Sequence, residues 1–196
     1  MTKIKRTECM KRYFNKLKKA FLLPEYGIKI NPIISGGCIR DTLLEKPVKD
    51  IDIFLPKNEV DTFLAYFGKS ARDCKCTFYW EDTNMKEQYR HSNILATYEI
   101  DIYPPTASET FFVNIIALTH DMTKDEICDR HAFGICQCAL DKDGFYFSDA
   151  FIKDYINKTM TLMRTEWGYD QTMKYFIRLY NKLKMPMRCQ EIGEAF

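Results

Sequence analysis

Residues 33–41 read IISGGCIRD, and residues 48–53 read VKDIDI. The first stretch is an apolar run rich in isoleucine that leads into two glycines and then into the start of a helix. The second alternates acidic and apolar side chains, which is typical of a half-buried strand. We therefore expect a strand, a glycine turn, a helix start and a second strand that carries two carboxylates. The rest of the fold is interpreted around this unit.

The glycine turn has the residues that a phosphate site needs. Gly36 and Gly37 would let a ligand approach the backbone closely, and they leave N–H groups at the start of the following helix. Arg40 lies one turn into that helix, where its guanidinium could form two hydrogen bonds to a phosphate. A Gly-Gly pair alone is usually only a turn, so the feature is informative only together with the second strand.

Two acidic residues in the second strand suggest a metal site. Asp50 and Asp52 are two residues apart, so on a strand both side chains project from the same face. Carboxylates roughly 5–7 Å apart repel each other unless a cation lies between them. Mg²⁺ (or Mn²⁺) suits this position, because it takes one or two carboxylates plus substrate phosphates. The alternative is that the pair forms only the solvent-exposed face of a strand.

In this order, these residues resemble the head domain of the tRNA nucleotidyltransferase and bacterial poly(A) polymerase family, within the DNA polymerase beta superfamily. That family has Gly-Gly-x-hydrophobic-Arg-Asp followed, after a short spacer, by Asp-x-Asp. The matching residues are Gly36, Gly37, Arg40, Asp41, Asp50 and Asp52. The resemblance implies that Asp50 and Asp52 are catalytic and hold two metal ions. It also implies that the other four residues bind a nucleoside triphosphate.

The implied reaction is in-line attack of a hydroxyl group on the α-phosphate, with release of pyrophosphate. Further along, residues 130–139 (RHAFGICQCA) stand in the place of the family's Arg-Arg-Asp-Phe-Thr strand. Arg130 and His131 are therefore the further nucleotide-binding residues that the resemblance implies. Ala132 stands where the family has an acid.

The superfamily places a third acid on a neighbouring strand, and the matching position here is Asn114. Glu99 or Asp101, on the strand before it, could take the same role. Residues 168–172 do not reproduce the family's base-reading Glu-Asp-x-x-Arg motif, so the sequence does not indicate which base is used.

The patterns outside these motifs predict an α+β protein: a polymerase-beta-like nucleotidyltransferase head with a central mixed or antiparallel sheet, surrounding helices and a short C-terminal helical neck. We expect a basic N-terminal helix over 1–27, the head domain over 28–162 and a truncated neck over 163–196. The strands are expected over 28–35, 50–55, 76–80, 93–98, 111–118, 133–140 and 145–148, with a loop over 81–92. The helices are expected over 7–22, 38–44, from 58 onward, and over 124–130, 149–157 and 169–184.

The charge is unevenly distributed along the chain. Residues 1–20 carry a net charge of +7, residues 21–150 carry −8 and residues 151–196 carry +3. The basic ends are either solvated helix faces or contact surfaces for a polyanion such as RNA. The acidic middle is suited to binding divalent cations.

The composition excludes several classes of protein. With 46% hydrophobic and 14% aromatic residues, the chain can form a packed core. It contains no apolar run near the ~18 residues that a membrane span needs, and the N-terminus lacks the apolar stretch of a signal peptide. Eight cysteines without an export signal favour reduced thiols in the cytoplasm. Cys74, Cys76, Cys136 and Cys138 are expected to be free and buried, the alternative being a zinc site.

Three functions remain open from the sequence. The first is a compact nucleotidyltransferase that adds NMP from an NTP to an RNA 3′ end, such as that of tRNA. The second keeps this chemistry but modifies a protein side chain or a small molecule. The third is a nucleotide- or RNA-binding protein whose catalysis has decayed. The Asp50–Asp52 pair argues against the third, because a decayed site has no physical reason to keep two mutually repelling carboxylates.

Overall fold

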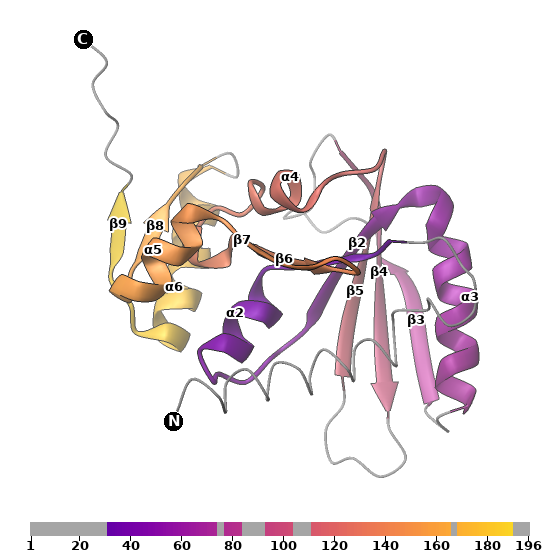
Figure 1. The fold of residues 1–196 in the computed structure, drawn as a ribbon. Helices are drawn as coiled ribbons and strands as arrows, with labels where there is room; N and C mark the ends of the chain where they lie inside the picture. Colours follow the sequence, from indigo (N-terminus) through magenta and orange to yellow (C-terminus); the bar gives the residue numbers. More distant parts are fainter. Residues whose placement is uncertain (1–30, 74–76, 84–92, 104–110, 166–167, 190–196) are drawn as a thin grey trace.

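The computed structural model describes residues 31–73, 77–83, 93–103, 111–165 and 168–189 (Figure 1). The N-terminal helix expected over 1–27 lies outside the described residues. The elements are β1 (Ile33–Ser35), α2 (Gly37–Leu43), β2 (Ile51–Pro56), α3 (Lys57–Asp73), β3 (Thr77–Thr83), β4 (Ile94–Tyr103), β5 (Phe111–Leu118), α4 (Lys124–Cys128), a 3₁₀ turn (Gly134–Cys136), β6 (Cys138–Asp141), β7 (Gly144–Phe147), α5 (Asp149–Asn157), β8 (Met160–Leu162), α6 (Tyr169–Leu183) and β9 (Met187–Cys189).

The main sheet has seven strands in the order β3-β4-β5-β2-β1-β6-β7. Strands β2 and β5 are parallel, and the other neighbouring pairs are antiparallel. The sheet is therefore mixed, which confirms the predicted α+β class. The α5, α6, β8 and β9 elements gather at the end of the molecule away from α3 (Figure 1). Strands β8 and β9 form a second, parallel pair.

Alternation along β2 divides the core between the two faces of the sheet. Ile51, Ile53 and Leu55 pack into the larger core together with residues of α2, α3 and α6. Phe54 points the other way and packs with Ile116 of β5 and with residues of α4. Because side chains alternate along a strand, Asp52 lies on the same face as Phe54, two residues nearer to the start of β2. This strand therefore presents a carboxylate beside the smaller core.

The structure differs from the sequence-based prediction around residues 133–140. We expected one continuous strand there, but Gly134–Cys136 form a 3₁₀ turn and β6 begins at Cys138. A Cβ on Gly134 would lie 2.7 Å from Asp154 Oδ2 and 3.0 Å from the Ala150 Cβ. The glycine thus allows the turn to pack against α5, and this packing, rather than strand propensity, determines the local structure. The loop expected over 81–92 is also partly wrong, because β3 continues to Thr83.

Cys38, Cys128, Cys136 and Cys138 are buried and free, whereas Cys74 and Cys76 lie outside the described residues. Burial raises the pKa of the Cys128 thiol to about 12 and also raises the pKa of Cys38. The thiols of Cys38 and Cys128 are therefore protonated at neutral pH and pack as small side chains. In the part of the chain that the structure describes, no helix is both long enough and apolar enough to span a bilayer.

Candidate active site

The glycine turn and the second carboxylate of the Asp-x-Asp pair lie side by side. Gly36 follows the last residue of β1 and precedes the first residue of α2. Across the antiparallel β1–β2 pair, Ser35 is the direct partner of Asp52. Because β1 leads into the turn and β2 carries the acid, the fold brings the predicted phosphate-binding turn to the predicted metal-binding strand.

The backbone at Gly36 has a conformation that favours glycine. Its φ is 84° and its ψ is −128°. Its N–H donates to the Cys138 carbonyl of β6 at 2.9 Å, and its carbonyl accepts from the Arg40 N–H at 3.2 Å. A Cβ here would lie 2.8 Å from Cε1 of His131. Gly36 therefore serves both a positive φ and close packing against an imidazole ring.

Replacing Gly36 with Ala is expected to lower the free energy of unfolding by about 2 kcal/mol, from backbone strain and steric overlap. Urea denaturation would measure this change. Gly37→Ala is the matched control, because the nearest atom to its Cβ would be Arg40 Nη2 at an ordinary 3.5 Å. If the two variants unfolded at the same urea concentration, the explanation given for Gly36 would be wrong.

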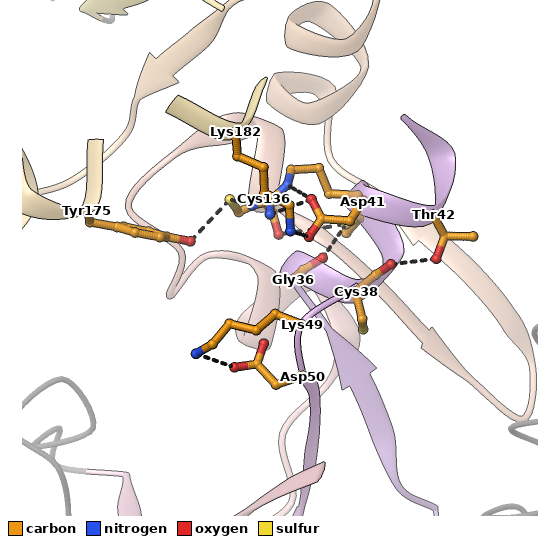
Figure 2. Close-up of polar contacts among 11 residues, drawn as sticks. Gly36, Cys38, Asp41, Thr42, Lys49, Asp50, Cys136, Tyr175 and Lys182 are labelled. Carbon is orange, nitrogen blue, oxygen red and sulfur yellow. Dashed lines mark hydrogen bonds and ion pairs between the residues drawn. The ribbon is translucent and has the colours of Figure 1, made fainter. Parts of the chain in front are cut away.

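Asp50 and Asp52 have different surroundings. Asp50 directly precedes β2, and its Oδ2 lies 3.3 Å from Nζ of Lys49. The side chains of this ion pair are 34% and 77% exposed, so the pair is solvated and can exchange Lys49 for another cation. Figure 2 shows the Lys49–Asp50 ion pair. Asp52 is half-buried, and its Oδ1 accepts a hydrogen bond of 2.8 Å from Nδ2 of Asn114.

The position predicted for a third acid is occupied by this amide. Asn114 is the direct β5 partner of Asp52. Glu99 pairs with Asn114 across β4 and β5 and therefore lies one strand farther from Asp52, whereas Asp101 pairs with Phe112. Because Asp52 accepts the amide hydrogen, Asn114 orients this carboxylate without adding negative charge.

Arg40 and Asp41 form a buried ion pair. Nε and Nη2 of Arg40 donate to Asp41 Oδ1 at 2.8 and 2.6 Å, and Nη1 donates to Cys136 Sγ at 3.0 Å. Both side chains are about 4% exposed, and Oδ2 of Asp41 contacts Nζ of Lys182 at 2.5 Å. We expected the guanidinium to face a phosphate. In this structure the guanidinium points into the protein instead, beside the glycine turn, because three hydrogen bonds hold it to two atoms, Asp41 Oδ1 and Cys136 Sγ.

His131 is held against the turn. Its Nε2 lies 2.9 Å from Ser35 Oγ, and the same hydroxyl donates to the Cys138 carbonyl at 2.8 Å. Since the single hydroxyl hydrogen goes to that carbonyl, Nε2 of His131 is the donor to Ser35. Burial, followed by the positive charges of Arg40 and Arg130, lowers the pKa of His131 to about 4. His131 is therefore neutral at pH 7 and orients the turn as a hydrogen-bond donor. Nη1 of Arg130 itself lies 3.8 Å from Sδ of Met122.

The low pKa of His131 predicts a pH-dependent stability. The unfolded chain binds this proton near the ordinary pKa of 6.5, whereas the folded protein binds it near pH 4. Between these values the unfolded state binds more protons. The contribution of His131 to the free energy of unfolding is therefore fully present above about pH 6.5 and decreases as the pH falls towards 4. Urea midpoints measured at several pH values should fall more steeply for the wild type than for His131→Gln. Parallel pH profiles would contradict this assignment.

The carboxylates fit a divalent cation that binds together with a nucleotide. Within the described ranges, no group of three or more His, Cys, Asp or Glu side chains is placed to hold a metal by itself. Mg²⁺ is commonly bound by one or two carboxylates, with substrate phosphates and water completing its shell. Asp50, with a replaceable cation partner, and Asp52, whose carboxylate is oriented by Asn114, provide such a donor set.

Sequence reasoning missed three residues around the Arg40–Asp41 pair: Cys136, Tyr175 and Lys182. The OH of Tyr175 lies 3.4 Å from Cys136 Sγ (Figure 2). Tyr175 and Lys182 are seven residues apart, so they lie on one face of α6. The seven-residue spacing indicates that the two side chains share a helix face, but it does not indicate which buried residues that face contacts.

A family model described as "Gabija anti-defense 2 family protein" matches residues 5–158. No curated protein is similar enough in sequence to match the chain. Among solved structures, an apo CCA-adding enzyme is 16% identical to this chain, with a TM-score of 0.61. The match covers 93% of this chain and 41% of the CCA-adding enzyme. The Thermotoga maritima CCA-adding enzyme complexed with tRNA is 16% identical, with a TM-score of 0.58, over 93% and 40%.

A third similar structure is a tRNA nucleotidyltransferase complexed with a primer tRNA and an incoming ATP analogue. It is 16% identical to this chain, with a TM-score of 0.55, over 87% of this chain and 46% of its own. Such low identity shows the fold alone, and the fold is that of the nucleotidyltransferase head. The chain spans less than half the length of each of these structures.

Proposed function

Because the chain belongs to the Gabija anti-defense 2 family and has the fold of a nucleotidyltransferase head, we propose that it is a metal-dependent nucleotidyltransferase. It transfers NMP from an NTP to a hydroxyl acceptor and releases pyrophosphate. The observation that carries the proposal is the Ser35–Asp52 pairing, which places the glycine turn beside a carboxylate-bearing strand. Neither feature alone would distinguish this chemistry from an ordinary turn or a solvated strand.

Each part of the site has a distinct role in the proposal. Asp50 and Asp52 hold the divalent cation, and Asn114 orients the Asp52 carboxylate. When bound, Mg²⁺ or Mn²⁺ lowers the pKa of the attacking hydroxyl and offsets the charge of the phosphates. Gly36 gives the turn its positive φ, and Gly37 lets the triphosphate approach the backbone. His131 stays neutral and fixes the turn through Ser35.

We propose a component of the Gabija defence as the acceptor, with a protein side-chain hydroxyl as the attacking group. This rests on the name of the family, which describes its members as acting against that defence. A second candidate acceptor is an RNA 3′ end, such as that of tRNA. It is favoured by the similar structures that contain tRNA and by the net charge of +7 on residues 1–20, which is suited to a polyanion.

The test is a transfer assay with each of the four α-³²P-labelled NTPs, Mg²⁺ or Mn²⁺, and one acceptor pool at a time. The pools are purified components of a Gabija system and total tRNA, and an Asp50→Asn/Asp52→Asn double variant is run beside the wild type. Label on a Gabija protein that is lost in the double variant would support the proposed acceptor. Label on tRNA instead would favour the second candidate.

A third result would reject the enzymatic proposal. If the wild type bound NTP but transferred no label to either pool or to itself, the chain would be a nucleotide-binding protein without catalysis. Equal labelling by the wild type and the double variant would show that a contaminant performs the reaction.

A further inference from the structure

One carboxylate connects two helices that are far apart in the sequence. Asp41 belongs to α2, and its Oδ2 lies 2.5 Å from Nζ of Lys182 in α6, 141 residues later. The other oxygen of Asp41 accepts both hydrogen bonds from Arg40. Figure 2 shows the Lys182 side chain reaching from α6 to Asp41, the last residue of the Gly36–Asp41 stretch.

The same helix reaches the Arg40 guanidinium by a second route. Tyr175 of α6 contacts Cys136 Sγ at 3.4 Å, and that sulfur accepts a 3.0 Å hydrogen bond from Nη1 of Arg40. The α6 face that carries Tyr175 and Lys182 therefore contacts Asp41 directly and Arg40 through the Cys136 sulfur. The Tyr175 ring also packs edge-to-face on the Phe133 ring, with ring centroids 5.6 Å apart, and this contact fixes α6 against the core.

The position of this pair links it to the glycine turn. A Cβ on Gly37 would lie 3.5 Å from Arg40 Nη2, so the guanidinium lies directly beside the turn. Arg40 and Asp41 cancel each other's charge, and Lys182 adds one positive charge to the cluster. Lys182 is 27% exposed, compared with 4% for Asp41, so this added charge remains partly open to solvent.

We propose that Lys182 is a positioning residue of the nucleotide site. By holding Asp41, it keeps Arg40 beside Gly37 and leaves an excess positive charge next to the turn that receives the triphosphate. This inference rests on the proposed function and deepens it, because it makes α6 a structural part of the nucleotide-binding site. Removing Lys182 leaves Asp41 with one partner instead of two and removes the excess charge, so the loss falls on nucleotide binding rather than on the chemical step.

The test compares four α6 variants of the full chain: Lys182→Met, Lys182→Gln, Lys182→Arg and the control Lys174→Met. Lys174 is exposed on the same helix. The dissociation constant of an NTP is measured with Mg²⁺ present, and KM and kcat are measured in the transfer assay. Lys182→Met should raise the dissociation constant and KM about tenfold, as expected for the loss of one charge-assisted contact. The kcat should change less than about twofold, and Lys182→Arg should restore most of the affinity.

The outcomes separate this inference from the proposed function. Lys182→Met with the NTP affinity of Lys174→Met would overturn the positioning role. A loss of kcat with unchanged KM would also overturn it. If Lys182→Met failed to fold, which urea denaturation would show, Lys182→Gln would carry the comparison, since it keeps a hydrogen-bond donor without the charge. If the wild type itself bound no NTP, the proposed function would fail, and the inference with it.

Discussion

Replacing Asp52 with Asn is expected to reduce the rate of nucleotidyl transfer by about 10³-fold, while the folded structure persists. The substitution keeps the size of the side chain but removes one negative charge from the carboxylate pair. An amide is a poorer ligand for Mg²⁺ than a carboxylate, so both cation binding and transition-state stabilisation decrease. Single-turnover transfer at saturating NTP, over a range of Mg²⁺ concentrations, would measure the effect.

Asp52 is a better position for this test than its neighbour. Its carboxylate is half-buried and oriented by the 2.8 Å hydrogen bond from Asn114, whereas Asp50 is paired with an exposed lysine. An Asn at position 52 can still accept from Asn114 through its amide oxygen. The structural effect of the substitution is therefore small compared with its effect on charge.

The matched control is Asp61→Asn, which removes the same charge from an exposed position of α3. Its transfer rate should equal that of the wild type. If Asp52→Asn kept more than about a tenth of the wild-type rate at every Mg²⁺ concentration, Asp52 could not be a metal-binding residue. Higher Mg²⁺ should rescue part of the loss if the substitution weakens cation binding.

The sequence predicted the parts of the fold that depend on local signals. The strand over 111–118 and the helix over 149–157 have the predicted boundaries, because an apolar run and an amphipathic period mark them directly. The short helix expected over 124–130 is present as Lys124–Cys128, and the Thr123 N–H at its start donates to Glu126 Oε2 at 2.8 Å. The Gly36 turn was also recognised, because glycine is favoured wherever φ is positive.

The parts that were not predicted depend on contacts between distant residues. The 3₁₀ turn after Phe133 forms because Gly134 packs against α5, and the pattern of residues 133–140 contains no sign of this contact. The direction of the Arg40 side chain is set by Cys136, and the environment of Asp41 is set by Lys182. A motif indicates which residue types a site needs, but it does not indicate which of them are turned inward by the rest of the chain.

The second large effect is expected at Asp154, whose carboxylate is fully buried. Its Oδ1 accepts from the hydroxyls of Thr159 and Thr161 at 2.9 and 2.7 Å, and its Oδ2 accepts from the Thr161 N–H at 2.8 Å. It therefore joins α5 to β8, and its close approach to Gly134 joins both to the 3₁₀ turn. That turn ends at Cys136, whose sulfur accepts a hydrogen bond from Arg40. The hydrogen bonds of Asp154 therefore also support the candidate active site.

Asp154→Ala should lower the free energy of unfolding by about 4 kcal/mol, because it leaves the buried Thr159 hydroxyl and both donors of the half-buried Thr161 without their acceptor. Asp154→Asn should cost nearly as much, since its amide nitrogen cannot accept from the donors that face it. Urea denaturation of both variants beside Lys153→Ala, an exposed neighbour on α5, would measure the difference. If Asp154→Asn were as stable as Lys153→Ala, the carboxylate would not be the acceptor that organises this region. A selective loss of NTP affinity in a folded Asp154→Asn variant would show that the network reaches Arg40 through the turn.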